Sequence, residues 1–216
     1  MRTVRSTIRK ARVTRAERRD QITQRLLHSV ERILGTGIGF AEISVEQLIT
    51  EADIARSTFY MYFEDKGALL LELADHVTVI MGEAARPWLE LPPKSNRAVL
   101  TEALRQVVCA YFTHRHMLAA VSEAAAYDPR VREQYGQVMA RRIEYMAQHF
   151  RDQQRRGSIR SDVDVPGVTP WITWMIERCL YQWLGHDERD NSQFDGSEII
   201  DGLSSVVWHT FYEGVR

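Results

Sequence analysis

An all-α fold is predicted for this chain, with a helix-turn-helix three-helix head at the N-terminus and a larger helical bundle behind it. Apolar residues recur at helical spacing along most of the 216 residues, and no convincing run of alternating apolar and polar residues is bounded by hairpin turns. The composition, with 44% hydrophobic and 26% charged residues, is that of a globular protein and excludes collagen-like and low-complexity classes. A chain of this length buries enough surface to fold without disulfides or a structural metal.

Two further features bear on location. Cys109 and Cys179 each lie in a helical pattern and are expected to be reduced, partly buried thiols, as is usual in the cytoplasm. No window approaches the ~18 consecutive apolar residues of a membrane span, so no membrane partner is expected. We therefore predict a cytoplasmic protein.

The formal charge of −1 is distributed unevenly along the chain. Residues 1–32 contain ten Lys or Arg and three Asp or Glu, a charge of +7, whereas the remaining 18 bases and 26 acids give −8. Residues 1–13 are predicted to be a flexible basic arm that meets a polyanion. A transit peptide and a merely solvated tail are the alternatives.

The head is predicted over residues 14–65. Its first helix, 14–34, is amphipathic and ends where Gly35 and two further glycines follow. Ser44 begins an S-x-x-Q capping box, so a short second helix is expected over 45–52.

The helical pattern resumes over 55–63, and with the preceding short helix it forms a helix-turn-helix. This geometry lets the later helix lie in a major groove while the earlier one crosses the DNA backbone. Its exposed side offers hydroxyls and a guanidinium to phosphates and base edges, and a lysine follows for a second phosphate. By periodicity alone, an ordinary pair of short helices with surface tyrosines remains the alternative. The candidate DNA-contacting residues of this pattern are Arg56, Ser57, Thr58, Tyr60, Tyr62 and Lys66.

The body is predicted over residues 66–216. Asp65 is expected to cap a helix that runs to about residue 86, where Pro87 limits it. Asp128 and Pro129 mark the start of the longest helix, as a cap followed by proline at the first helical position. The further helices are predicted over residues 96–113, 117–126, 129–156, 166–184 and 197–212.

Residues 52–66 read A-D-I-A-R-S-T-F-Y-M-Y-F-E-D-K and resemble the recognition segment of TetR-family transcriptional repressors, A-G-V-S-x-x-T-[FL]-Y-x-[YH]-F-x-[SD]-K. The resemblance implies that Phe59 and Phe63 are core. Asp53 stands where the family has glycine and Ala55 where it has the capping serine, so the turn departs from the family pattern. A weakened cap costs about 1 kcal/mol. The resemblance also implies DNA contacts by Thr58, Tyr60, Tyr62 and Lys66 and a phosphate contact by Ser44.

The layout of the whole chain is similar to that of the EthR subgroup of this family, including Glu177-Arg178 in the next-to-last helix and a final helix ending in W-H-T-F-Y. The resemblance implies an apolar ligand channel in the body. Thr173 and Ile176 stand where that channel uses amide side chains, so the polar anchor for a ligand differs. The matched positions around the cavity are Leu100, Val107, Tyr111, Tyr135, Met139, Tyr145, Met146, Thr173, Ile176 and Tyr181.

Apart from the family resemblance, the predicted helices 129–156 and 166–184 of the body are rich in Trp, Tyr and Met. Such a stripe is either ordinary core or the lining of a small-molecule pocket. Trp171, Trp174 and Trp183 cannot all lie on one helix face, so a partner chain is expected to cover some of them. The resemblance implies the same arrangement, a homodimer formed through the last two helices.

No catalytic motif is present, and His114-x-His116 lacks the spacing of a helical metal site, so we predict no enzyme, no cofactor and no metal. The predicted function is a repressor that leaves a double-stranded DNA operator when an apolar small molecule binds the body. The alternative is a helical small-molecule-binding or enzymatic bundle whose basic N-terminus binds RNA or anionic lipid. An operator mechanism needs the arm together with Tyr60 and Lys66, whereas lipid binding needs only the arm's charge.

Overall fold

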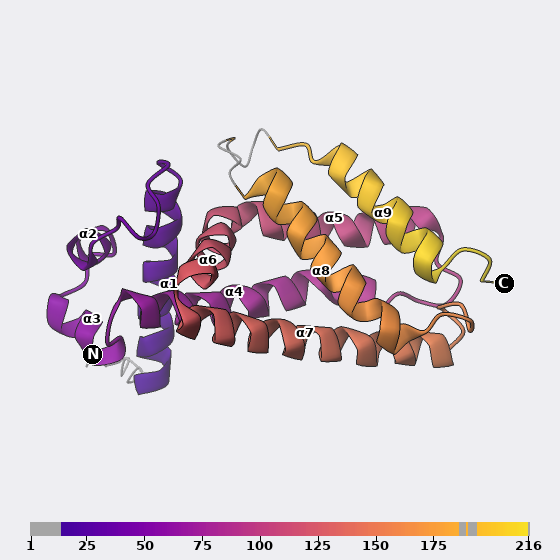
Figure 1. The fold of residues 1–216 in the computed structure, drawn as a ribbon, viewed down its shortest axis with the longest axis horizontal. Helices are drawn as coiled ribbons and strands as arrows, with labels where there is room; N and C mark the ends of the chain where they lie inside the picture. The colour runs from indigo at the N-terminus through magenta and orange to yellow at the C-terminus, as the bar shows by residue number, and fades with distance from the viewer. Residues whose placement is uncertain (1–13, 186–188, 190–193, 216) are drawn as a thin grey trace, which may run out of the picture.

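The computed structural model describes residues 14–185, 189 and 194–215, and within these ranges it contains helices and no strand (Figure 1). The predicted all-α architecture is confirmed. The basic arm, residues 1–13, lies outside the described residues. The helices are α1 Arg15–Leu34, α2 Val45–Glu51, α3 Arg56–Tyr62, α4 Lys66–Leu89, α5 Arg97–Thr113, α6 Arg115–Tyr127, α7 Pro129–Arg155, α8 Val165–Leu184 and α9 Ser197–Phe211.

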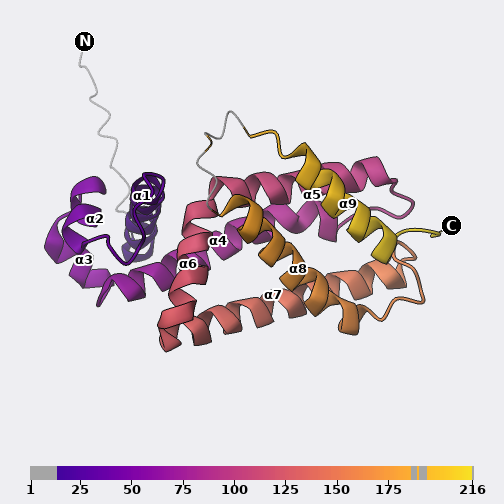
Figure 2. The ribbon, with the colours of Figure 1, turned by 45° about the horizontal axis from the view of Figure 1, so that its top comes forward.

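The head consists of α1, α2 and α3, which pack around a small apolar core at one end of the molecule (Figure 2). Thr14 caps α1 and Ser44 caps α2, and each takes part in a capping box with the side chain three residues later. Leu26, Leu48 and Phe59, one from each helix, are fully buried. The caps and the apolar spacing therefore fix the three helices much as the sequence predicts.

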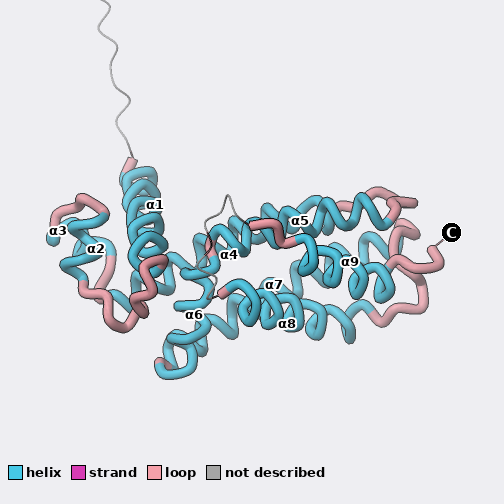
Figure 3. The backbone as a smooth tube through the Cα atoms, turned by 90° about the horizontal axis from the view of Figure 1, so that it is seen from above, coloured by secondary structure: helices cyan, strands magenta, loops and turns pink. Residues whose placement is uncertain are grey.

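Helix α4 leaves the head and runs into the body, where α5 and α7 pack along it (Figure 2). Viewed from above, the head occupies one end of an elongated molecule and the chain ends at the other (Figure 3). Helix α6 packs against α7 and also contacts α1, so it is a second connection between body and head. Across the described part of the chain, none of these helices is long and apolar enough to cross a membrane.

The prediction that Pro87 limits α4 is wrong, because the helix continues to Leu89. Proline removes one helical hydrogen bond, but tertiary packing outweighs that loss here. Trp88 and Leu89 are both buried, and the fully buried Gln153 donates its amide Nε2 to their carbonyl oxygens at 3.0 and 2.8 Å. The hydroxyl of Tyr212 donates to Gln153 Oε1 at 3.0 Å, so this amide joins α4, α7 and the end of α9.

The expectation of partly buried thiols is also wrong, since Cys109 and Cys179 are both free and exposed. Their neighbours Val108 and Leu180 take the buried positions on α5 and α8. Each cysteine therefore lies on the outer face of its helix.

Gln153→Ala should lower the free energy of unfolding by about 2–4 kcal/mol, because it leaves two carbonyls and a hydroxyl without their buried partner. Gln106→Ala, at an exposed position of α5, is the matched control and should change it by less than about 0.5 kcal/mol. Urea denaturation of both variants measures the difference. Equal losses in the two variants would contradict a structural role for Gln153.

Candidate DNA interface and effector cavity

Helix α3 presents a polar and aromatic face to solvent because its apolar side chains point into the head. Phe59 is fully buried, and Phe63, directly after the helix, packs against it with ring centroids 5.4 Å apart. Both are core, as the resemblance implied. The side chains left on the outside include those of the candidate contacts: Arg56, Ser57 and Tyr60 are exposed, and Thr58 and Tyr62 are half-buried.

The turn before α3 accommodates its departures from the family pattern through an arginine of α1. Asp53 has a φ of 48°, a left-handed conformation that glycine adopts easily and that aspartate tolerates better than most residues. Arg25 donates to the Asp53 carbonyl oxygen at 2.6 Å and lies 3.2 Å from its carboxylate. Ala55 makes no side-chain cap to α3, as expected for alanine. The Arg25 contacts therefore stabilise a turn that, in the family pattern, depends on glycine at the position of Asp53 and on serine at the position of Ala55.

Arg56, the only basic residue of α3, is oriented by neighbours on two helices. Its guanidinium forms an ion pair with Glu46 of α2 and lies 5.5 Å from the ring centroid of Tyr60. These exposed contacts leave the guanidinium at the surface of the helix-turn-helix. Ser44, at the start of α2, is exposed as well, although its hydroxyl already accepts from the Gln47 backbone.

Lys66, a predicted phosphate contact, also makes hydrogen bonds within the head that the sequence does not predict. Its ammonium donates to the carbonyl oxygens of Phe40, Ala41 and Ile43, at 3.3, 2.5 and 3.0 Å. These carbonyls belong to the loop between α1 and α2, which offers three acceptors to a cation at the start of α4. The side chain therefore braces the head from inside, and a sequence motif has no means of showing that loop.

A basic cleft lies between α1 and α3. Arg15, Arg18 and Arg25 of α1 face Thr58 and Tyr62 across it. The three arginines are exposed and share one face of α1, at spacings of three and seven residues. Sequence reasoning counted them only within the N-terminal charge excess, although their helical spacing was the signal that could have placed them beside α3.

The body contains a cavity of about 40 Å³ enclosed by α4, α5, α6, α7 and α8. Three of the ten residues predicted around a ligand line it, namely Tyr111, Tyr135 and Met139. The others lie elsewhere. Tyr145 is 47% exposed on the outside of α7, and Tyr181 is half-buried on α8. The remaining predicted residues are buried in the core without lining this cavity: Leu100, Val107, Met146, Thr173 and Ile176.

Thr173 is not the polar anchor of this cavity. Its hydroxyl donates to the Thr169 carbonyl at 2.8 Å and lies 3.6 Å from Met146 Sδ, so its hydrogen-bonding capacity is used within the core. The polar side chains that line the cavity include a cluster of Tyr111, Tyr135, Arg142 and Glu177, and Asp75, Thr78 and Gln134 lie elsewhere in the wall. Glu177 lies at helical spacing from Thr173, Leu180 and Leu184, and this spacing was the signal that placed an acid on the buried face of α8. The sequence analysis used Glu177 only as a mark of kinship.

Burial governs the ionisation of this cluster. It raises the pKa of Tyr111 and of Tyr135 well above the usual tyrosine value, and the negative charge of Glu177 adds to the shift. Both phenols therefore stay protonated, and Tyr135 donates to Glu177 Oε1 at 2.7 Å. Burial lowers the pKa of Arg142, while Tyr135 and Glu177 oppose that effect.

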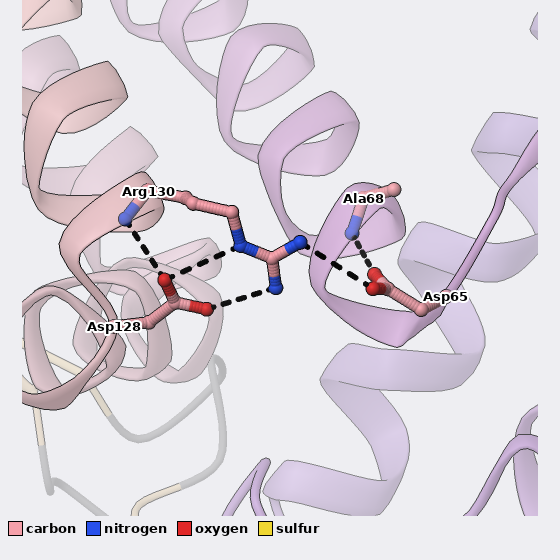
Figure 4. A network of polar contacts seen from close by, with 4 residues as sticks. All are labelled: Asp65, Ala68, Asp128 and Arg130. Carbon is pink, nitrogen blue, oxygen red and sulfur yellow. Dashed lines mark hydrogen bonds and ion pairs between the residues drawn. The ribbon is translucent and has the colours of Figure 1, made fainter.

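Helix α4 connects the cavity with the head. It supplies six lining residues, among them Leu71, Thr78 and Met81, and its first turn is capped by Asp65, which accepts from the Ala68 backbone at 2.7 Å. Figure 4 shows Arg130 reaching across to this cap from the start of α7.

Arg130 joins the N-terminal ends of α4 and α7. Its guanidinium lies 3.6 Å from the Asp65 carboxylate and 3.1 Å from that of Asp128, the cap of α7 (Figure 4). Arg130 holds the pKa of Asp128 below its usual value, mainly through this side-chain hydrogen bond. On α6 and α1, His114 lies 3.3 Å from Glu31. The body thus contacts the head through Arg130 and His114, and α4 also contacts α1 through Glu72, which pairs with Arg19 at 2.9 Å.

Helices α8 and α9 run in opposite directions on the same side of the body (Figure 1). Large apolar side chains of both helices face outward: Trp171 is 79% exposed, and Trp174, Trp183 and Val206 are also exposed. The sequence predicts that these tryptophans do not share a buried face, and the structure places them outside the monomer's core.

Two family models match the chain. Residues 37–73 match the bacterial regulatory proteins of the tetR family, and residues 100–213 match the C-terminal domain of the transcriptional regulator EthR. The HTH-type transcriptional regulator EthR of Mycobacterium tuberculosis (strain ATCC 25618 / H37Rv) is 27% identical over 175 residues, which are 81% of this chain and 79% of the relative. The EthR of Mycolicibacterium smegmatis is 26% identical over 163 residues, 76% of this chain and 75% of that protein.

Solved structures show the same fold. A TetR-family transcriptional regulator from Mesorhizobium loti matches with a TM-score of 0.67 and 18% identity, over 92% of this chain and 99% of that one. The regulator FadR of Bacillus subtilis, solved in complex with stearoyl-CoA, matches with a TM-score of 0.59 and 17% identity, over 92% and 100%.

A helix-turn-helix head joined by one long helix to a helical body with a cavity defines a ligand-responsive DNA-binding regulator. Because the EthR C-terminal model covers more than half of the chain, this protein belongs to the TetR family of transcriptional regulators and is EthR-like. It is a DNA-binding repressor with a C-terminal ligand-binding domain, and it acts on operator DNA as a dimer, as TetR-family regulators do. Family and fold point to a regulator and not to an enzyme, and they favour DNA over the alternative of RNA or lipid.

Lys66→Met should lower the midpoint of thermal unfolding, because three loop carbonyls lose a cationic donor at a cost of about 1–3 kcal/mol. The matched control is Lys94→Met, which removes an exposed lysine from the loop before α5. Circular dichroism melting of both variants measures the shift. Identical midpoints would show that the three contacts contribute nothing to the stability of the head.

Proposed function

We propose that the protein reads its operator with α3 in the major groove while Arg15 and Arg18 of α1 neutralise phosphates beside it. The observation that carries the proposal is the cleft in which the α1 arginines face Thr58 and Tyr62. Guanidinium groups beside a recognition helix suit phosphate contacts, and hydroxyls on its surface suit base edges. Arg56, Ser57 and Tyr60 complete this surface, with Ser44 at the start of the preceding helix.

In this proposal, residues 14–65 form the DNA-binding head, residues 66–216 form the ligand-binding and dimerisation body, and residues 1–13 form a basic arm. The arm adds affinity without sequence preference, because a basic tail contacts phosphates or a minor groove.

The proposed dimer forms through the outer face of α8 and α9. A second copy that covers the exposed tryptophans stabilises the dimer by roughly 25 cal/mol for each Å² of apolar surface buried. A two-fold axis there gives two heads that reach half-sites in successive major grooves, roughly 34–36 Å apart.

The proposed switch is the widening of the cavity. Its volume of about 40 Å³ is well below the ~300–1,000 Å³ of a typical small-molecule site, so an effector must separate the helices around it. Six lining residues lie on α4, whose first turn is tied to Arg130 and to the head loop. Displacing α4 therefore displaces the head, and the two heads lose their match to the half-site spacing.

DNA binding is tested by fluorescence anisotropy with the duplex that flanks the protein's own coding region and with random duplex, at two salt concentrations. Arg18→Ala should weaken binding to both duplexes alike. It should also make the slope of log K against log salt concentration less steep by about 0.9, the value for one phosphate contact. Thr58→Ala should instead lower the ratio of specific to random binding.

Arg155→Ala is the control for this experiment, since it removes an exposed charge at the far end of α7. If Arg18→Ala and Arg155→Ala have the same small effect in a folded dimer, α1 has no place in the interface. If the wild-type protein binds the flanking duplex no more tightly than random duplex, the proposed function fails for that site.

The dimer is tested by sedimentation velocity. Trp171→Glu places a charge in the proposed interface and should give monomers that lose operator binding. Tyr127→Glu changes an aromatic residue of nearly equal exposure, 78% against 79%, at the end of α6 and should remain dimeric. A dimeric Trp171→Glu variant would place the interface elsewhere.

A further inference from the structure

We propose that the effector is a neutral amphiphile whose polar head both donates and accepts hydrogen bonds, held by Glu177, Tyr111 and Arg142 in the cavity. The inference deepens the proposed function and rests on it, because it names the chemistry of the ligand that this cavity takes. It also adds a polar head to the apolar effector that the sequence predicts. A carboxamide on an apolar chain is the simplest member of the class.

Two buried oxygen atoms in the wall of the cavity have no partner among the described residues. Tyr111 is 4% exposed and its hydroxyl is unpartnered, and Glu177 is 8% exposed with Oε2 unpartnered. The other carboxylate oxygen of Glu177 is already bonded by Tyr135 at 2.7 Å. Since buried polar groups are rarely left unsatisfied, a pair of them facing one cavity is typical of a site that receives a polar ligand group.

The two atoms differ in what they require. A carboxylate oxygen only accepts, so Glu177 needs a donor from the ligand. The Tyr111 hydroxyl can donate or accept. A head that offers both an N–H or O–H and a carbonyl or hydroxyl oxygen satisfies both atoms together.

Arg142 adds a donor and balances the charge. Its guanidinium lines the cavity and has no hydrogen-bond or ion-pair partner among the described residues. The other acid in the wall, Asp75, is paired with Arg141 at 3.6 Å, so Glu177 and Arg142 are the opposite charges that remain. An anionic head is repelled by Glu177 and a cationic head by Arg142, which leaves a neutral head as the best match.

The rest of the wall accounts for the apolar part of the ligand. Leu71, Val77 and Met81 of α4 face Val121 and Val138 across the cavity. None of these side chains can bond a polar group, so this part of the wall suits the apolar chain of the ligand.

The test uses three probes with the same six-carbon length: hexanamide, hexanoate and hexylammonium. Isothermal titration into wild-type dimer should give hexanamide at least about tenfold tighter binding than either ion. The short chain keeps the required widening of the cavity small.

Two variants remove the proposed contacts. Tyr111→Phe removes a hydroxyl that no other described residue bonds, so it should fold as stably as wild type while binding hexanamide about two- to tenfold more weakly. Glu177→Gln removes the negative charge and should reduce the preference for hexanamide over hexanoate by about tenfold or more. Tyr145→Phe, on the outer surface of α7, is the matched control and should leave all three affinities unchanged.

Equal binding of the three probes, tightest binding of an ion, or no binding of any probe overturns the proposal, as does a Tyr111→Phe variant with wild-type affinity. Operator binding by the same preparations, measured without a probe, distinguishes this failure from that of the proposed function. Protein that binds operator but prefers no neutral probe is a repressor whose effector has other chemistry, whereas protein that binds no operator refutes the function itself.

Discussion

The structure depends on one constraint, which is that α4 belongs to the head and to the body at once. A helix of 24 residues is about 36 Å long and moves as a unit. Its first turn is fixed by the Asp65 cap and by the Lys66 contacts with the head loop, and its middle lines the cavity. Gln153 holds its far end. Any change of packing in the body therefore reaches the head through one rigid element.

Two long basic side chains stabilise the head, and one of them holds the turn where the family pattern has glycine. Arg25 bonds the left-handed Asp53 turn, and Lys66 bonds the loop before α2. Both groups connect segments that lie more than twenty residues apart in the sequence, so they tie the recognition helix to α1 and α4. Part of the positive charge of this protein thus has a structural use, whereas Arg15 and Arg18 line the cleft beside α3 that we propose as part of the DNA interface.

The sequence predicts the helices because their signals are local. The capping boxes at Thr14 and Ser44 and the apolar spacing need only neighbouring residues. It fails for Pro87, where Gln153, distant in sequence, supplies the compensation. It also does not predict the contacts of Lys66, because the carbonyl partners of that lysine belong to a loop without a motif. Long-range contacts of this kind have no signature in a single sequence.

The cavity was predictable only in part for the same reason. Helical periodicity identifies which helices carry aromatic and sulfur-containing side chains, but which of these reach a shared space depends on how five helices cross. Tyr111 and Tyr135 reach it and Tyr145 does not, although all three lie in amphipathic helices. A buried acid such as Glu177 costs stability unless it is bonded, and an ordinary core would be more stable without it. An acid with an unpartnered oxygen in the wall of this cavity argues for a ligand that bonds it. In the proposed switch, the movement of α4 then couples binding of the ligand's polar group to the displacement of the DNA-binding head.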